Sequence, residues 1–103
     1  MKGRIHYDGH MFHSEGELKR YLGLRELVKS GRLTNFEVRP VIPLMVNQVL
    51  IAEYVPTFRF TDQAHHTERF VQVLSRPATS VLQLKIALFE ALFTQKIELW
   101  GDG

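Results

Sequence analysis

Two helical patterns, each opened by a capping box, enclose a β-rich middle and restrict this chain to folds that mix helices with a sheet. The first box is Ser14-Glu15-Gly16-Glu17, in which the serine can accept from the amide three residues on and Glu17 can reach back. Apolar residues then recur at helical spacing up to a terminating glycine, which predicts a helix over about 14–30. A second box at Ser80 predicts a helix to about Phe93. Its predicted apolar face is Leu84, Ala87, Leu88, Ala91 and Leu92.

The segment between the helices has the alternation and the breakers of short strands. Phe36 and Val38 alternate with polar neighbours, which predicts a half-buried strand. Pro40 and Pro43 confine their part of the chain to a sheet edge or a bend. Further strands are predicted over 49–60 (interrupted at Pro56), 70–74 and 97–100, with a polar turn over 61–68. This order predicts an α/β or α+β domain: a small mixed sheet of three or four strands, an N-terminal helix and a crossover helix.

Length and composition indicate one globular domain over residues 1–103. Apolar residues make up 45% and charged residues 23%, ordinary values for a globular chain. No apolar run approaches the ~18 residues of a membrane span, and the N-terminus lacks the apolar core of a signal peptide. The absence of cysteine excludes disulfides and thiolate metal sites. We therefore expect a cytoplasmic protein that does not bind membranes.

The net charge of +2 is unevenly distributed. Residues 1–39 carry eight basic and five acidic side chains, whereas residues 40–103 carry five and six. An excess of cations can contact nucleic-acid phosphates. The same excess is equally typical of a solvated helix face, so charge alone leaves both interpretations open.

Three segments match a known nuclease signature in order and spacing. They are Phe12-His13-Ser14-Glu15-Gly16-Glu17, Tyr54-Val55-Pro56-Thr57-Phe58 and Phe70-Val71-Gln72-Val73-Leu74-Ser75, followed by the second helix and the last strand. Over about residues 8–100 the chain resembles the PD-(D/E)XK nuclease fold. It is similar in particular to small phage Holliday-junction-resolving endonucleases of the endonuclease I type, and to a family of small phage proteins with the same signature. The resemblance implies a restriction-endonuclease-like core.

The resemblance also implies which positions would form an active site. Glu17 would be the helix carboxylate, Thr57 the central aspartate, Gln72 the second acid and Leu74 the lysine. Nucleases of this kind use carboxylates to hold Mg²⁺, which polarises the phosphate and generates hydroxide. Because threonine, glutamine and leucine supply no charge, only Glu17 retains its role. We therefore expect no enzyme activity by this mechanism and no cofactor; Mg²⁺ would be needed only for residual nuclease activity.

Other residues offer weak substitutes for the missing site. Lys85 on the second helix could replace the lysine, but it restores no acid. Asp62, His65 and His66 share one turn and could hold a transition metal, although a solvated loop is the more common arrangement. His10 and His13 are expected at the surface, and Glu17 has a full structural explanation as a helix cap. No metal site is therefore predicted.

Three functions are consistent with these features of the sequence. The first is a catalytically inactive interaction protein of phage or prophage origin, which binds and modulates a host protein in the host cytoplasm through exposed apolar groups. Its candidate contacts are Met45, Phe60 and Trp100, each of which core packing would also explain. The second is a non-cleaving, structure-specific DNA-binding protein, and the third is an active metal-dependent nuclease with a rearranged site. A homodimer is compatible with all three. The candidate DNA contacts are Lys19, Arg20, Arg25, Lys29, Arg32, Arg59, Arg69 and Lys85.

Overall fold

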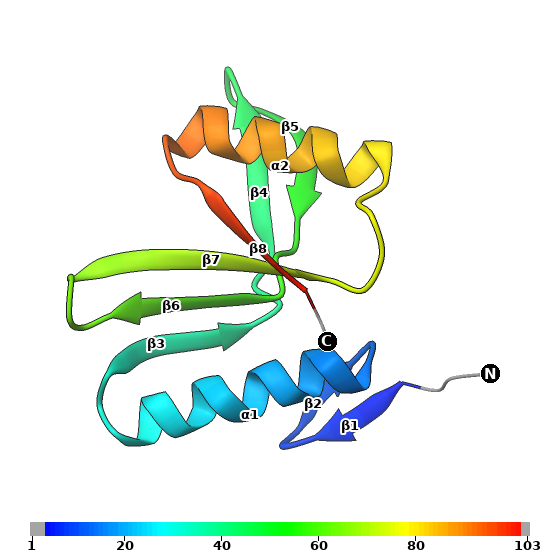
Figure 1. Ribbon diagram of the computed structural model, residues 1–103. Coiled ribbons are helices and arrows are strands. Elements are labelled where there is room, and N and C mark those ends of the chain that lie inside the picture. Colours follow the sequence, from blue (N-terminus) through cyan, green and yellow to red (C-terminus); the bar gives the residue numbers. More distant parts are fainter. Residues whose placement is uncertain (1–3, 102–103) are drawn as a thin grey trace.

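The computed structural model describes residues 4–101 and contains two helices whose ends match the sequence prediction (Figure 1). α1 runs Glu15–Lys29, and the Ser14 side chain accepts from the Glu17 amide at 3.0 Å. α2 runs Ser80–Phe93. Its cap is Thr79, whose hydroxyl accepts from the Leu82 amide at 3.1 Å, so the predicted cap at Ser80 is wrong by one residue. Threonine performs the same capping chemistry as serine, which is why the sequence leaves this choice open.

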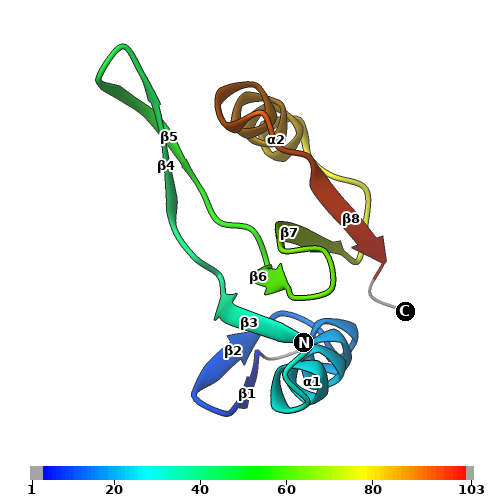
Figure 2. The same cartoon turned by 90° about the vertical axis from the view of Figure 1, so that its left-hand side faces the viewer.

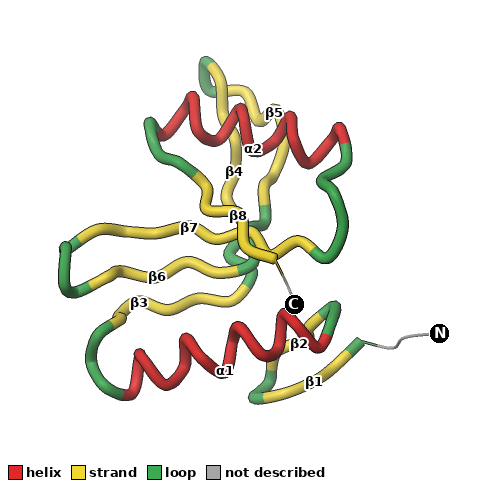
Figure 3. Tube along the Cα trace, viewed as in Figure 1, coloured by secondary structure: helices red, strands yellow, loops and turns green. Residues whose placement is uncertain are grey.

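The central sheet has four strands in the order β3-β6-β7-β8 (Figures 1 and 3). They are β3 (Leu33–Val38), β6 (Phe58–Asp62), β7 (Thr67–Leu74) and β8 (Ile97–Gly101). β3, β6 and β7 pair antiparallel, whereas β7 and β8 pair parallel with α2 as the crossover between them. The sheet is therefore mixed, and the α+β class with an early helix and a crossover helix is confirmed.

Two hairpins lie outside that sheet and were not predicted. β1 (Ile5–Tyr7) pairs with β2 (His10–Phe12), and β4 (Ile42–Val46) pairs with β5 (Val49–Tyr54). The β4–β5 turn is Asn47-Gln48, with φ of 50° and 66°, as in the primed turns that suit the twist of a hairpin. The segment predicted as one strand over 49–60 is thus β5 and β6, which belong to different sheets.

Each face of the central sheet packs on its own apolar cluster (Figure 2). α1 covers one face, where Phe60 is only 1% exposed. The suggestion that Phe60 contacts a partner is therefore wrong, because its ring is part of the core. α2 and the β4–β5 hairpin cover the other face, where Phe89 contacts Tyr54 and Phe70. The α1-side cluster is Phe12, Tyr21, Leu24, Leu33, Phe58, Phe60, Val71 and Val73; the α2-side cluster is Ile42, Leu44, Tyr54, Phe70, Phe89 and Ile97.

The predicted apolar face of α2 coincides only in part with the face that packs on the core. The inward side chains are Leu82, Ile86, Leu88 and Phe89, of which only Leu88 was predicted. Leu84 is 71% exposed, and Ala87, Ala91 and Leu92 are also exposed, so these four predictions are wrong. The helix has two apolar faces, and spacing alone cannot decide which of them the sheet covers.

Within residues 4–101, neither helix combines the length and the apolar character that crossing a membrane requires.

Candidate functional site

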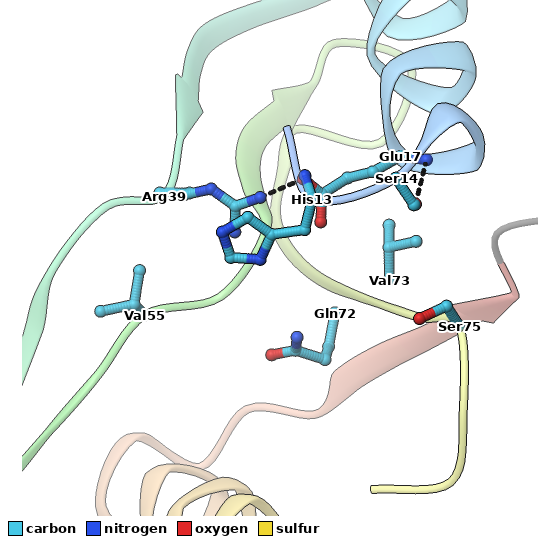
Figure 4. A pocket seen from close by; sticks show the side chains of 8 residues that line it. All are labelled: His13, Ser14, Glu17, Arg39, Val55, Gln72, Val73 and Ser75. Atoms are coloured by element: carbon cyan, nitrogen blue, oxygen red, sulfur yellow. Dashed lines mark hydrogen bonds and ion pairs between the residues drawn. The ribbon is translucent and has the colours of Figure 1, made fainter. Parts of the chain in front are cut away.

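A pocket of about 320 Å³ opens where the start of α1, the end of β7 and the link between β5 and β6 meet (Figure 4). It contains two of the positions that the resemblance identified, Glu17 and Gln72. Thr57 lies behind them with no exposed surface, and Leu74 does not line the pocket. The lining residues are His13, Ser14, Glu17, Arg39, Val55, Gln72, Val73 and Ser75.

Glu17 is buried in this pocket and its charge is balanced inside the fold. Its side chain is 6% exposed and pairs with the guanidinium of Arg39, as Figure 4 shows. The same carboxylate oxygen accepts from the His13 amide at 2.9 Å. Among residues 4–101, Glu17 is the only acidic side chain that lines the pocket and Arg39 is the only basic one, histidine aside. A bound cation would therefore have to compete with an arginine that is already in place.

Arg39 is held by hydrogen bonds from both its side chain and its backbone amide. Its Nε donates to the Met11 carbonyl at 3.3 Å, and its amide donates to the Thr57 carbonyl at 2.9 Å. It comes directly after β3 and has a φ of 54°. Sequence reasoning missed this residue because its acidic partner lies in a distant segment. The one available signal was an arginine placed between a predicted strand and Pro40.

Thr57 uses its hydroxyl to fasten the β5–β6 link to β7. Its Oγ1 accepts from the Val73 amide at 3.0 Å, and its own amide donates to the Val71 carbonyl at 2.9 Å. Both bonds are shielded from water, since Thr57 is 0% exposed. The residue at the expected aspartate position therefore has a structural role in this fold.

The Gln72 side chain, like that of Thr57, is hydrogen-bonded within the fold. Its Oε1 accepts from the Tyr54 hydroxyl at 2.8 Å. Burial of the Tyr54 ring raises the pKa of its phenol far above the ordinary value, so it remains a donor at neutral pH. Glu17, Thr57 and Gln72 occupy the acid positions that the resemblance implies. Each of them forms an ion pair or a hydrogen bond within the fold.

The described residues contain no group of three or more histidine or acidic side chains arranged to hold a metal. Asp62 and His65 do approach each other, with 3.6 Å between carboxylate and Nδ1. Asp62 also pairs with Arg69 at 3.3 Å, so its charge is already compensated. His66 has a φ of 53°, and this left-handed backbone conformation helps to form the turn that connects β6 and β7.

The eight candidate DNA contacts divide into two groups. Four form ion pairs: Arg25 with Asp8, Lys29 with Glu26, Arg59 with Glu37, and Arg69 with Glu98. The Arg69 guanidinium donates twice to Glu98, at 2.7 Å each, and this contact holds the pKa of the Glu98 carboxyl below its usual range. Within the part of the chain that the structure covers, the other four make no ion pair: Lys19, Arg20, Arg32 and Lys85.

Of the candidate protein contacts, only Met45 is freely exposed, on the β4–β5 hairpin. Trp100 is half-buried against the α1-side cluster. Its Nε1 donates to Glu98 at 3.3 Å, and the Arg20 guanidinium lies 5.3 Å from its ring centre. Trp100 is thus largely committed to contacts inside the fold.

Thr57→Val is expected to destabilise the fold by roughly 1–3 kcal/mol, because valine fills the space but leaves the buried Val73 amide without an acceptor. Thr57→Ser keeps the hydroxyl and is the matched control, with a smaller loss from the missing methyl group. Urea unfolding of the three proteins checks this order. Equal stability of the valine and wild-type proteins would show that the Thr57 bond contributes nothing.

A scan against models of protein families, a search of curated proteins and a search of solved structures each returned no match to this chain.

Proposed function

We propose that this chain is a catalytically inactive protein on a nuclease-like scaffold, which acts by binding another protein. The observation that carries the proposal is the Glu17–Arg39 pair. Mg²⁺ in phosphate-cleaving sites is bound through one or two free carboxylates together with waters and substrate phosphates. Among the described residues this pocket offers one carboxylate, and an arginine already neutralises it. The resemblance to phage proteins makes a host protein in the host cytoplasm the proposed partner, with modulation of that protein as the outcome.

The β4–β5 hairpin is the proposed contact surface. Residues 40–52 contain no charged side chain, in a chain that is 23% charged. Near the turn, five large apolar side chains are exposed, and Figure 2 shows the hairpin extending away from the central sheet. A projecting, uncharged, apolar surface fits a partner protein with an apolar cleft. The five side chains are Met45, Val46, Val49, Leu50 and Ile51.

DNA binding without cleavage is the second candidate. It is favoured by Lys19, Arg20, Arg32 and Lys85, which make no ion pair among the described residues and could contact phosphates. Of these, Arg20 already donates to the Gly101 carbonyl at 3.0 Å. It is weakened by the other half of the predicted contacts, whose charges are compensated by neighbouring carboxylates. We therefore rank it below the protein-binding proposal.

One gel assay distinguishes three outcomes: DNA cleavage, DNA binding without cleavage, and no interaction with DNA. The purified protein is incubated with labelled duplex, single-stranded and four-way-junction DNA, with Mg²⁺ or Mn²⁺, at two salt concentrations. We expect neither cleavage nor a shift. Metal-dependent cleavage that Glu17→Ala abolishes would overturn the proposal and support a rearranged nuclease. A salt-sensitive shift without cleavage would favour DNA binding instead.

The protein-binding surface is tested with a matched pair of variants. Leu50→Glu places a charge on the exposed hairpin, and Leu84→Glu places the same charge on the exposed face of α2. Each immobilised protein is exposed to host lysate under identical conditions. We expect a protein that is retained by the wild type and by Leu84→Glu but lost by Leu50→Glu. Retention that is unchanged by Leu50→Glu would rule out the hairpin as the contact surface.

A further inference from the structure

Arg39 has a donor group that the fold leaves unused. Its Nε donates to the Met11 carbonyl at 3.3 Å, and its Nη2 pairs with Glu17. Its Nη1 makes no hydrogen bond or ion pair among the described residues. The bonds on Nε and Nη2 hold the guanidinium in one orientation, so the N–H groups of Nη1 remain for a ligand.

Gln72 has an unused donor group in the same pocket. Its Oε1 accepts from the Tyr54 hydroxyl at 2.8 Å, and this bond fixes which way the amide is turned. Its Nε2 has no partner in the part of the chain that the structure describes, and in Figure 4 it is turned towards Arg39 and His13. Ser75, at the rim, contributes a hydroxyl that likewise has no hydrogen-bond partner within residues 4–101.

The two unused nitrogen groups are open to the pocket and are not sealed in the core. Arg25 Nε is the only side-chain nitrogen or oxygen of the described residues that is both buried and unpaired. Arg39 Nη1 and Gln72 Nε2 are therefore accessible to a ligand. The carboxylate of the pocket, that of Glu17, is 6% exposed and already accepts from Arg39 and from the His13 amide.

We propose that this pocket binds a carboxylate group, with Arg39 Nη1 and Gln72 Nε2 as donors to its two oxygens. A carboxylate accepts on both oxygens, and guanidinium N–H groups suit it in geometry and charge. The pocket volume of about 320 Å³ exceeds that of the group itself, and Val55 and Val73 provide apolar walls for the rest of the ligand. The ligand is therefore a carboxylate on a short carbon chain, either a small acid or an acidic side chain of a protein.

Charge favours a carboxylate over a phosphate in this pocket. The charges of Glu17 and Arg39 cancel, so with His13 neutral the lining has no net charge. A carboxylate brings one negative charge near Glu17, whereas a phosphate group brings about 1.5 to 2 at neutral pH. Repulsion from Glu17 is therefore smaller for the carboxylate.

NMR titration of the isotope-labelled protein with sodium acetate, at constant ionic strength and neutral pH, measures this binding. We expect saturable shifts of the Gln72 side-chain amide and of the Val73 and Ser75 backbone amides. The dissociation constant should be on the order of millimolar, because the ligand is small. The α-amide of N-acetylglutamate is the second probe and imitates a glutamate side chain in a protein. Tighter binding of this probe than of acetate assigns the pocket to a protein side chain, and equal binding assigns it to a small acid.

Two variants test the donors. Gln72→Glu removes the N–H groups but keeps an acceptor for the Tyr54 hydroxyl, so the fold is retained. We expect it to raise the dissociation constant of acetate at least about tenfold, since a second negative charge also enters the pocket. Ser75→Ala removes a hydroxyl with no partner among the described residues and should raise the constant a few-fold. Leu84→Glu adds a charge on the exposed face of α2 and is the matched control, with an unchanged constant.

Three results would overturn the proposal. The first is an acetate titration of the wild-type protein without saturable shifts. The second is a dissociation constant that neither Gln72→Glu nor Ser75→Ala changes, which would attribute the shifts to a general effect of salt. The third is tighter binding of inorganic phosphate than of acetate. The amide spectrum of each variant shows whether it is folded. The proposal does not use the β4–β5 hairpin, so it and the partner-binding proposal can fail separately.

Discussion

Arg39→Ala is expected to cost this protein on the order of 3–5 kcal/mol of folding free energy. The substitution leaves the Glu17 carboxylate, 6% exposed, without the guanidinium that balances its charge. Domains of this size are stable by about 5–15 kcal/mol in total. The loss would therefore lower the melting temperature by more than ~10 °C. Thermal and urea unfolding at neutral pH measure both quantities.

Two comparisons isolate the buried charge as the cause. Arg59→Ala removes an arginine from an ion pair with Glu37 that water reaches, and should cost no more than about 1 kcal/mol. Glu17→Gln combined with Arg39→Met removes both charges and should be more stable than Arg39→Ala alone. If Arg39→Ala lowered the free energy of unfolding no more than Arg59→Ala does, the Glu17–Arg39 pair would stabilise the fold no more than an exposed ion pair.

Phe89→Ala should be destabilising by about 3–5 kcal/mol, because it empties the centre of the α2-side cluster. The Phe89 ring lies 4.9 Å from that of Phe70 and 5.7 Å from that of Tyr54, so neighbouring rings lose their contacts. Leu84→Ala, on the same helix, is the control and should change the stability of the monomer by less than ~0.5 kcal/mol. Urea unfolding at low protein concentration compares the two. A larger loss from Leu84→Ala would mean that the outer face of α2 packs within the chain.

Local signals in the sequence were sufficient for the helices and for most strands of the central sheet. Capping residues and a terminating glycine fix the ends of α1 within one residue, because their chemistry acts on the nearest turn. The nearly continuous apolar run 70–74 identified β7, and the short segment 97–100 was correctly predicted as the last strand, β8. The β4–β5 hairpin was missed because its turn is Asn-Gln, without the glycine that usually marks a two-residue turn.

The residues of the candidate site could be predicted from the sequence only in part. Glu17 and Gln72 were named from the resemblance to a nuclease signature, and they line one pocket. Arg39 was not named, since the partner of a charge depends on how distant segments pack and spacing says nothing about it. Most of the face of α2 was misassigned for a related reason. Of the predicted residues only Leu88 packs on the α2-side cluster, because α2 is apolar around much of its surface and the packing of distant segments decides which side is covered.

The parallel pairing of β7 with β8 has a consequence for how the sheet is assembled. Phe70 pairs with Ile97, so α2 and both of its connections must be in place before this pairing can form. The β6–β7 hairpin, in contrast, closes over a short turn and needs no later part of the chain. Contacts that are distant in sequence form slowly, because the entropy of closing the loop is lost before they stabilise anything. Until β8 pairs with it, one edge of β7 has no strand partner, and an unpaired strand edge is a site at which chains can aggregate.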